Sequence, residues 1–393
     1  MVQQFTVTVR PSNGDYSSLN AAATGLANDI TAADIKVFSI SAYSTPTIAA
    51  GDTVLGQSSG ATGVCVLVNF ARSQILIKTI AVFAFQSGEV VQKTADANVN
   101  VTLSNAGDSP MIGIECYSMS DTTAVNITTP WVTSATNYLR IYTPISERHL
   151  GTWNDTKYRL EIASASNTRA ITCNIAYACI DGLQISVDST STNYADAIGF
   201  TLSTASSYII TSNCIIKGIN DNYGSGIYVV NNTGYIYNNM IYDFTGSTSY
   251  GLYSNTGTAL YVYNNTLINC DYGLRGTAFL YAKNNIFRSN ALAPTTNMTA
   301  ANCGYNATDA ASLGYTAQTG DRVSQTFAFV NEIGYDFHLS AIDTGARNFG
   351  LTDPSSGVFL DDIDGNTRPG QLIWDIGADE YFPTGGNRGY ITG

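Results

Sequence analysis

A ten-residue motif with two adjacent asparagines at its centre recurs in the middle of the chain. The copies read YIYNNMIYDF at 235–244, YVYNNTLINC at 261–270 and YAKNNIFRSN at 281–290, with a weaker copy, IITSNCIIKG, at 209–218. A fold that repeats once per copy is therefore required. We align the four copies through one asparagine each, at intervals of 26, 26 and 20 residues: Asn213, Asn239, Asn265 and Asn285.

A second series of short β-type segments alternates with the first. It consists of IGF at 198–200, GIY at 226–228, GLY at 251–253 and GLR at 273–275. Two strands per period, without helical spacing of apolar residues, predict a parallel β-helix in which each period is one coil. A leucine-rich repeat has a similar length, but its leucine frame is absent. We predict an all-β chain built mainly as a right-handed parallel β-helix over 106–340.

The paired asparagines are expected to mark the same bend in successive coils. Asparagine tolerates a left-handed backbone in a turn, and stacked asparagine side chains can hydrogen-bond to one another as a ladder. We therefore assign Asn213, Asn239, Asn265 and Asn285 to a structural ladder. A row of ligand-binding asparagines is the alternative.

Three further regions flank the predicted β-helix. Residues 1–44 read as a strand, a turn and a short helix with Ser17 or Ser18 as N-cap, which would cover the open end of the first coil. Residues 45–105 contain short strands separated by Gly turns, a pattern typical of a small inserted β-barrel. Residues 341–393 are predicted to form an acidic C-terminal cap and a tail.

Composition narrows the classes of partner. Charged residues make up 12% of the chain and the net charge is −12, so no basic surface is expected to bind nucleic acid. No apolar run reaches the roughly 18 residues of a membrane span, so no membrane is expected as a partner. The start, MVQQFTVTVR, has no basic region followed by an apolar core, and we expect no signal peptide.

Seven cysteines are present. Their number is odd and none forms a CxxC pair, so a disulfide framework or a zinc site is not predicted. Several lie in apolar strand-like runs such as ITCNIAYACI, where a thiol behaves as a small buried hydrophobe.

Three segments carry resemblances. GDTVLGQSSGATGVCVLV followed by FAFQSGEVV resembles a small β module of tailed-phage structural proteins, through Gly51, Gly56, Ser59, Gly60, Ala61, Thr62, Gly63, Phe85, Gly88 and Glu89. NYLRIYTPISERHLGTWNDTKYRL looks like a segment of right-handed β-helix proteins of phage and environmental origin. DFHLSAIDTGARNFG with DDIDGNTRPGQLIWDIGADEY resembles the C-terminal signature of the pectate-lyase-like β-helix superfamily.

These resemblances imply a function class. They point to a non-enzymatic virion structural protein of a tailed phage, a capsid decoration or spike component, assembled in a host cytoplasm with other virion proteins. Such rods are often homotrimers. A tailspike depolymerase acting on host surface glycans is the first alternative, and a bacterial surface adhesin is the second.

One polar cluster is a candidate carbohydrate site. Glu147, Arg148 and His149 are followed by Trp153, whose ring could stack on a sugar. Adjacent strand residues point to opposite faces, so Glu147 and His149 would share a face that excludes Arg148. A purely structural role is the alternative. His338, the other histidine, lies in YDFHLS and is expected to be a packed or edge residue of a strand.

The acidic C-terminal motif is a candidate cation site. Asp362, Asp364 and Gly365 resemble the start of a calcium loop, although the closing glutamate is missing. The alternatives are a structural calcium ion there, or a turn closed by pairing of Arg368 with a carboxylate and no cofactor.

We predict no catalytic residues. A glycosidase needs two carboxylates on one face, about 5 to 9.5 Å apart. The carboxylates of the repeat region that could form such a pair are Asp181, Asp196, Asp221, Asp243 and Asp271. Their spacing along the chain is too irregular to place two of them side by side in neighbouring coils.

Overall fold

The computed structural model describes residues 1–80, 82–164, 168–189, 195–202, 207–219, 223–246, 248–255, 258–277 and 279–383. It divides into two compact units. The first comprises Met1–Glu115 and Thr128–Ile141, and the second comprises Cys116–Ile127 and the chain from Tyr142 onward. Each unit is described by itself. No helix in the described ranges combines the length and the apolarity that crossing a membrane requires.

The first unit begins with the strand and short helix expected from the sequence. Strand β1 (Val2–Val9) is followed by helix α1 (Leu19–Gly25), and β1, β8 (Ser109–Cys116) and β11 (Leu139–Tyr142) lie in that order in one sheet. Ser18 is the N-cap, since its side chain accepts from Ala21 N–H at 3.1 Å. The indole of Trp131 donates to Ala23 O at 2.8 Å and holds the helix C-terminus.

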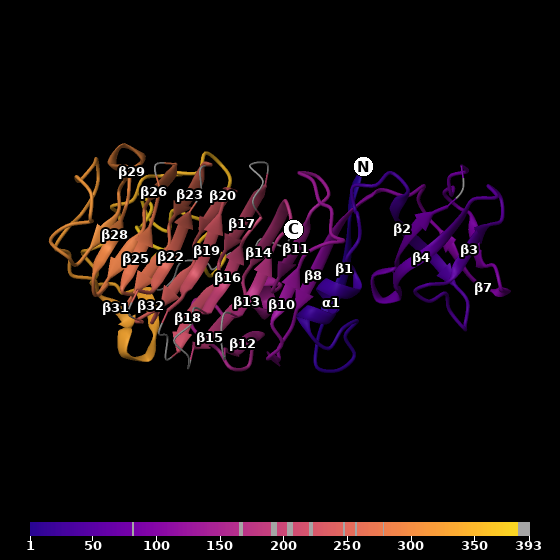
Figure 1. Ribbon diagram of the computed structural model, residues 1–393, viewed down its shortest axis with the longest axis horizontal. Helices are drawn as coiled ribbons and strands as arrows, with labels where there is room; N and C mark the ends of the chain where they lie inside the picture. Colours follow the sequence, from indigo (N-terminus) through magenta and orange to yellow (C-terminus); the bar gives the residue numbers. More distant parts are fainter. Residues whose placement is uncertain are drawn as a thin grey trace. The chain divides into compact units, whose positions relative to one another are not determined.

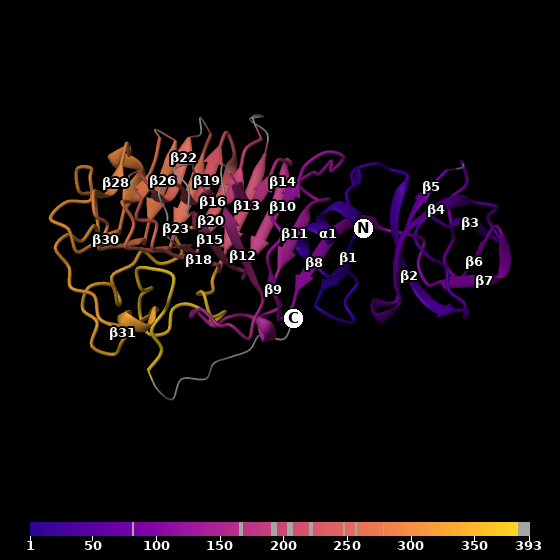
Figure 2. The same ribbon diagram turned by 60° about the horizontal axis from the view of Figure 1, so that its bottom comes forward.

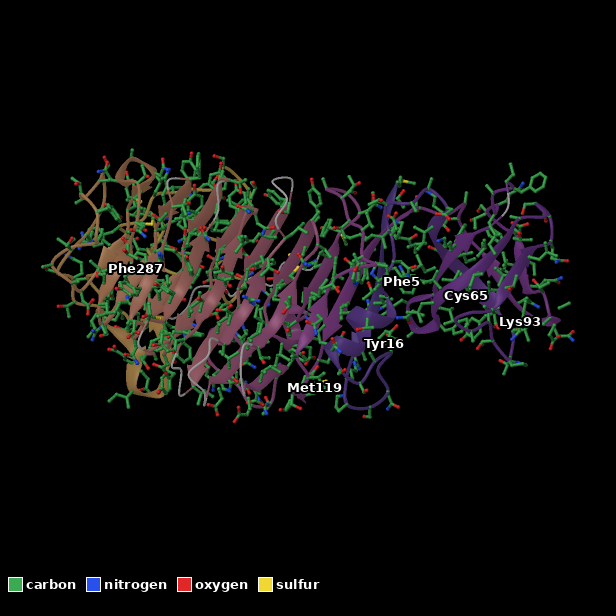
Figure 3. The ribbon with its side chains drawn as sticks, viewed as in Figure 1. Phe5, Tyr16, Cys65, Lys93, Met119 and Phe287 are labelled. Atoms are coloured by element: carbon green, nitrogen blue, oxygen red, sulfur yellow. The ribbon has the colours of Figure 1, made fainter. Side chains whose placement is uncertain are left out.

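A closed antiparallel barrel occupies most of the first unit (Figure 1). Its order is β2-β5-β4-β3-β6-β7, and buried apolar residues, Cys65 among them, fill it (Figure 3). The first barrel strand precedes residue 45, where the sequence placed the start of the module. The strands are β2 (Ile35–Tyr43), β3 (Thr53–Gly56), β4 (Thr62–Asn69), β5 (Gln74–Thr79), β6 (Val90–Lys93) and β7 (Asp96–Leu103), with a 3-10 turn η1 at Phe70–Arg72.

The second unit is a stack of coils in which the chain visits three parallel sheets in turn. It is therefore β-helix-like, with Phe287 among the fully buried side chains of its interior (Figures 1 and 3). One sheet contains β14 (Tyr177–Asp181), β17 (Tyr208–Ser212), β20 (Thr233–Tyr237), β23 (Leu260–Tyr263), β26 (Leu280–Lys283) and β29 (Cys303–Gly304). The next contains β10 (Val125–Ile127), β13 (Thr168–Cys173), β16 (Ala195–Phe200), β19 (Ser225–Val230), β22 (Tyr250–Asn255), β25 (Tyr272–Arg275) and β28 (Ala293–Thr296). The third contains β9 (Ser120–Asp121), β12 (Arg159–Ser164), β15 (Gln184–Ser189), β18 (Ile215–Ile219), β21 (Met240–Tyr242), β24 (Thr266–Ile268), β27 (Ile286–Arg288) and β30 (Ala307–Thr308).

The second asparagine of each pair points into the stack and forms a ladder. Asn239 Nδ2 donates to Asn265 Oδ1 at 2.9 Å, and Asn265 Nδ2 donates to Asn285 Oδ1 at 3.1 Å. The row continues to Asn306, which accepts from Asn285 at 3.0 Å. All four side chains are fully buried.

Asn213 does not belong to this row. The register pairs Ser212 with Tyr237, so Cys214 occupies the ladder position and Asn213 the position before it. Cys214 N–H donates to Asn239 Oδ1 at 2.9 Å. The alignment through Asn213 was therefore off by one residue, because a weak copy with a single asparagine does not show which of the pair it keeps.

The first asparagine of each pair has a left-handed backbone and binds the C-terminal segment. Asn238, Asn264 and Asn284 have φ of 54°, 51° and 57°. Their side-chain amides donate to Asp361 O at 2.9 Å, to Gly377 O at 3.2 Å and to Leu351 O at 2.8 Å, respectively. The C-terminal segment, which we define as residues 351–383, thus contacts three successive coils along their side (Figure 2), and does not lie across the last coil as a cap at 341–393 would.

A buried arginine closes this segment on itself. The guanidinium of Arg368 is paired with Glu380 at 2.9 Å, both side chains being almost fully buried. It also donates to the carbonyls of Gly377 and Ala378 at 3.0 and 2.8 Å. The pairing of Arg368 with a carboxylate, expected from the sequence, is present and fixes the turn.

The remaining elements lie outside the three sheets. They are the hairpin β31 (Phe329–Asn331) and β32 (Asp336–Leu339) with the 3-10 turns η2 (Ile145–Glu147), η3 (Ala300–Asn302) and η4 (Glu332–Gly334).

Candidate functional site

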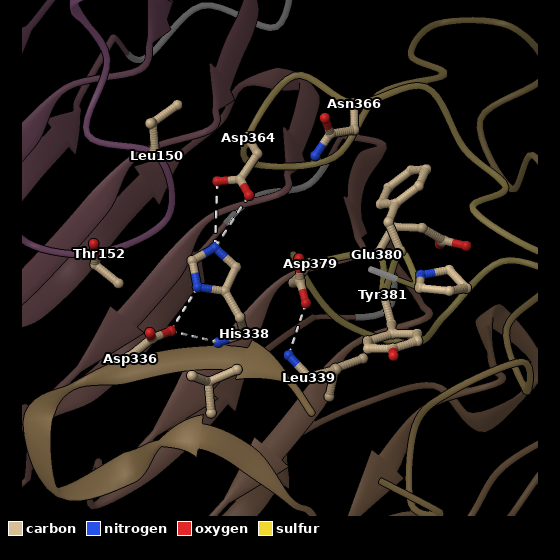
Figure 4. Close-up of a pocket in the computed structure, with 13 residues that line it drawn as sticks. Leu150, Thr152, Asp336, His338, Leu339, Asp364, Asn366, Asp379, Glu380 and Tyr381 are labelled. Atoms are coloured by element: carbon tan, nitrogen blue, oxygen red, sulfur yellow. Dashed lines mark hydrogen bonds and ion pairs between the residues drawn. The ribbon is translucent and has the colours of Figure 1, made fainter. Parts of the chain in front are cut away.

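The β31–β32 hairpin and the C-terminal segment border an open pocket of about 610 Å³ on the second unit (Figure 4). The hairpin supplies Asp336 and His338, and the C-terminal segment supplies Asp364 and Asp379. Leu150, Thr152 and Tyr381 line the rest of the pocket with Val330, Leu339, Asn366, Glu380, Phe382 and Pro383.

His338 lies between two carboxylates. Its Nδ1 is 2.5 Å from Asp336 Oδ1, and its Nε2 is 3.2 Å from Asp364 Oδ2. Burial lowers the pKa of His338, but the hydrogen bonds to Asp336 and Asp364 outweigh burial and raise the pKa to about 11. The imidazole is therefore cationic at neutral pH and cannot act as a general base.

Asp379 completes a cluster of three potential ligands. Donor atoms of His338, Asp364 and Asp379 all lie within 4.8 Å of one another. Oδ2 of Asp379 accepts from Leu339 N–H at 2.7 Å. Burial raises the pKa of Asp379 to about 6, against the opposing charge of His338.

The predicted calcium pair is divided by the fold. Asp364 reaches the pocket, but Asp362 is fully buried and turns back on its own loop. Asp362 Oδ1 accepts from Asp364 N–H at 3.0 Å and from Asn366 N–H at 2.8 Å. The Asp362 carboxylate thus accepts hydrogen bonds within its own turn and faces away from the pocket, so Asp362 and Asp364 do not form a calcium loop.

A second pocket, of about 530 Å³, lies on the third sheet. Trp153, Lys217 and Tyr335 line it with Gly218, Ile219, Tyr242, Asp243, Thr245, Asn269 and Gly334. We call it the Trp153–Tyr335 groove. Tyr335 stacks on Tyr242 with ring centroids 5.3 Å apart, and Asn269 donates to Asp243 Oδ1 at 2.6 Å.

Lys217 is the only basic residue that lines this groove in the described part of the chain. Its ammonium lies 3.6 Å from the centre of the Trp153 ring. Burial lowers the pKa of Lys217, and the carboxylates that oppose this, led by Glu161, lie beyond ion-pair distance. The groove therefore holds a partly desolvated cation without an anionic partner among the described residues.

The three predicted carbohydrate residues do not meet. Trp153 lines the groove, but Glu147 lies outside it and is 3.9 Å from Lys157. His149 is buried, with Nδ1 accepting from Gly151 N–H at 3.0 Å and Nε2 2.9 Å from Asn213 O. Burial lowers the pKa of His149 to about 3, so this neutral ring is a structural link. The assignment of His149 to a sugar-binding face was wrong.

The carboxylates considered for catalysis are dispersed. Asp181 is 2.8 Å from Arg148, and Asp196 is 2.9 Å from Arg169. Asp271 accepts from Ser249 N–H, and Asp243 is the only one of the group in a described pocket lining. Asp221 lies outside the described residues.

The sequence could indicate only those pocket residues that lie close together along the chain. Asp336 and His338 are two apart on one strand, so a shared face could have been inferred. Nothing local links them to Asp364 and Asp379, nor Trp153 to Lys217. In comparisons with known proteins, no family model, curated protein or solved structure matches this chain.

Proposed function

We propose that this protein is a non-enzymatic attachment component of a virus particle, a rigid β-helical rod whose Trp153–Tyr335 groove binds a carbohydrate of a host surface. One observation carries the proposal: a partly desolvated Lys217, packed over the Trp153 ring and without an ion-pair partner among the described residues, lies in an open groove. Aromatic rings bind the apolar faces of sugars, while the few polar groups of a pocket fix orientation.

The groove favours an anionic sugar. Lys217 lies beyond ion-pair distance of the described carboxylates, and a carboxylate, sulfate or phosphate on the ligand would supply the missing charge. Burial strengthens this interaction relative to a surface pair. The partly exposed ring of Tyr335, held by stacking on Tyr242, offers the adjoining apolar surface.

A rod function agrees with the construction of the second unit. The coils that contain Asn239, Asn265, Asn285 and Asn306 are tied to one another by the buried asparagine ladder. The C-terminal segment also contacts three successive coils along their side. We propose that the stack winds right-handed, as crossovers between parallel strands do in about 98% of cases. The resemblance of the barrel to a tailed-phage module, and the trimers common among such rods, extend the proposal to contacts with other virion proteins and to a homotrimer.

Depolymerase activity is the weaker alternative. Hydrolysis of a glycan needs two carboxylates on opposite sides of the bond. Asp243 is the only carboxylate among the described residues that line the groove, and its Oδ1 already accepts a hydrogen bond from Asn269. Binding without cleavage is therefore expected.

Binding is tested on a printed array of neutral, uronic-acid, sialylated, sulfated and phosphorylated oligosaccharides. The wild-type protein is expected to bind an anionic class, and Lys217→Met to lose at least tenfold in affinity. Lys283→Met, which removes a lysine from another sheet, is the matched control and should bind normally. Wild-type protein that binds nothing, or Lys217→Met that binds as well as wild type, would refute the proposal.

The place of the protein on a particle needs a separate test. Antibodies against the purified protein are used to label virus particles from its source for electron microscopy. Label on tails or heads supports a virion component. Particles without label would contradict that part of the proposal and favour an adhesin.

A further inference from the structure

We propose that His338, Asp364 and Asp379 bind a divalent transition-metal ion of the zinc or manganese class at the wall of the 610 Å³ pocket. The inference concerns a site distinct from the sugar-binding groove and does not depend on glycan binding. It rests on four observations, of which the first is the donor set. One imidazole nitrogen and two carboxylates suit zinc, manganese or iron(II), whereas calcium prefers oxygen ligands alone.

The second observation is distance. Zinc binds nitrogen and carboxylate oxygen at about 2.0–2.2 Å, so neighbouring ligand atoms in a tetrahedral site are roughly 3.4 Å apart. His338 Nε2 is 3.2 Å from Asp364 Oδ2, and all three donor atoms lie within 4.8 Å. Small side-chain rotations would therefore close the set around one ion.

The third observation is an unused oxygen on Asp379. The side chain is 5% exposed, and its Oδ2 is bound to the backbone N–H of Leu339. Among the described residues, Oδ1 of Asp379 receives no hydrogen bond, and the carboxylate borders the pocket (Figure 4). Because Oδ1 is not enclosed by protein atoms, it is available to a cation or a water molecule that enters the pocket.

The fourth observation is the support behind the histidine. Asp336 holds Nδ1 of His338 from the opposite side of the ring, at 2.5 Å. Metal-binding histidines commonly have their second nitrogen fixed by a carboxylate in this way, which aims the first nitrogen at the metal. A metal ion at Nε2 would replace the proton now shared with Asp364 and leave the Asp336 contact intact.

The open side of the cluster faces the pocket. Three protein ligands leave at least one coordination position free, which water or an oxygen of a ligand would occupy. The alternative is a metal-free ion-pair cluster that fastens the hairpin to the C-terminal segment, and the experiment must distinguish the two.

The test uses untagged, full-length protein stripped with chelator and titrated with Co²⁺ alone. Co²⁺ bound in a four- or five-coordinate nitrogen and oxygen site absorbs visible light more strongly than aqueous Co²⁺, and Zn²⁺ should abolish that added absorption by competition. His338→Gln is expected to lose the spectrum. Asp379→Asn should weaken binding at least tenfold, although its amide oxygen can still accept from Leu339 and maintain the fold. Asp336→Asn, behind the ligands, is expected to weaken binding by roughly 10- to 100-fold.

Two controls keep the result specific. His149→Gln removes the other histidine of the chain, and Asp155→Asn removes an exposed carboxylate. Both are expected to retain the Co²⁺ spectrum, and circular dichroism checks the fold of every variant. The proposal would be overturned by wild-type protein that adds no absorption to that of free Co²⁺ at millimolar concentration, by added absorption retained in folded His338→Gln, or by its loss in folded His149→Gln.

Discussion

Replacing Asn265 by leucine tests whether the buried asparagine ladder holds the coils together. Asn265 Oδ1 accepts from Asn239 N–H and Nδ2 at 3.0 and 2.9 Å. Its amide donates to Ile236 O, Tyr263 O and Asn285 Oδ1 at 2.9, 3.0 and 3.1 Å. Leucine has a similarly branched side chain with the same number of heavy atoms and is bulkier than asparagine, so no space remains for a replacing water molecule.

The expected loss of stability follows from the hydrogen-bonding groups that Asn265→Leu leaves without a partner. The Asn239 backbone N–H loses its side-chain acceptor in the interior, which costs about 1–3 kcal/mol. The other lost hydrogen bonds cost about 1 kcal/mol each, while burial of the apolar leucine offsets about 2 kcal/mol. We expect a net destabilisation of about 4 kcal/mol.

Hydrogen exchange followed by mass spectrometry measures this locally, because a chain with two units need not unfold in one step. Peptides spanning β20 to β24 should exchange much faster in Asn265→Leu, while barrel peptides stay unchanged. Asn331→Ala is the control, since Asn331 is exposed and its side chain caps one N–H of the hairpin turn. A loss below about 1 kcal/mol in Asn265→Leu, the typical net contribution of a single hydrogen bond, would refute the reasoning.

Three further predictions concern the segments around the pockets. Arg368→Met leaves Glu380 buried and unpaired, so we expect a loss of about 3–5 kcal/mol and faster proteolysis of the C-terminal segment; resistance equal to wild type would contradict this. The pKa of His149 is about 3 in the folded protein and about 6.5 in the unfolded chain. Below pH 6.5 the unfolded chain therefore binds a proton that the folded protein does not, and the free energy of unfolding falls by about 1.4 kcal/mol per pH unit as the pH drops toward 3. His149→Gln should flatten that slope in urea unfolding between pH 6.5 and 4, and an unchanged slope would count against it. Gly151→Ala adds a Cβ that would lie 2.1 Å from His338 Nε2 at a φ of +72°, so thermal unfolding should occur at a lower temperature, and an unchanged midpoint would show that the ring can move aside.

The repeat could be predicted because its determinants are local. A strand, a bend and an inward amide recur within each ten-residue copy, and stacking then follows from the period. The role of the first asparagine could not be predicted in this way. Asn238 binds Asp361 O across 123 residues of sequence, and no pattern near Asn238 indicates that partner.

The barrel motif has a physical explanation that the sequence alone did not provide. The carboxylate of Glu89 accepts from the backbone N–H groups of Ser58, Ser59 and Gln86 at 2.9, 2.7 and 2.8 Å. The glutamate at the end of the motif thus fixes the turn at its beginning. A Cβ at Gly56 would lie 2.5 Å from Glu89 Oε1, which explains why glycine is needed there.

The candidate sites were predictable only in part. Trp153 was identified by residue type, but its partner Lys217 lies 64 residues later in the sequence, in β18. The neighbouring Tyr335 lies on the hairpin turn. His338 was expected to be a packed strand residue, and it is mostly buried. Its carboxylate partner Asp364 is contributed by the C-terminal segment, whose course depends on contacts with several coils.

The central claim is that the protein binds a glycan and leaves it intact. Tryptophan fluorescence of the protein and light scattering of an acidic polysaccharide are recorded on the same mixture over hours. We predict a saturable fluorescence change in wild type, absent from Trp153→Phe, with constant polysaccharide chain length. A falling chain length, or no fluorescence change with any acidic or neutral polysaccharide, would contradict the account.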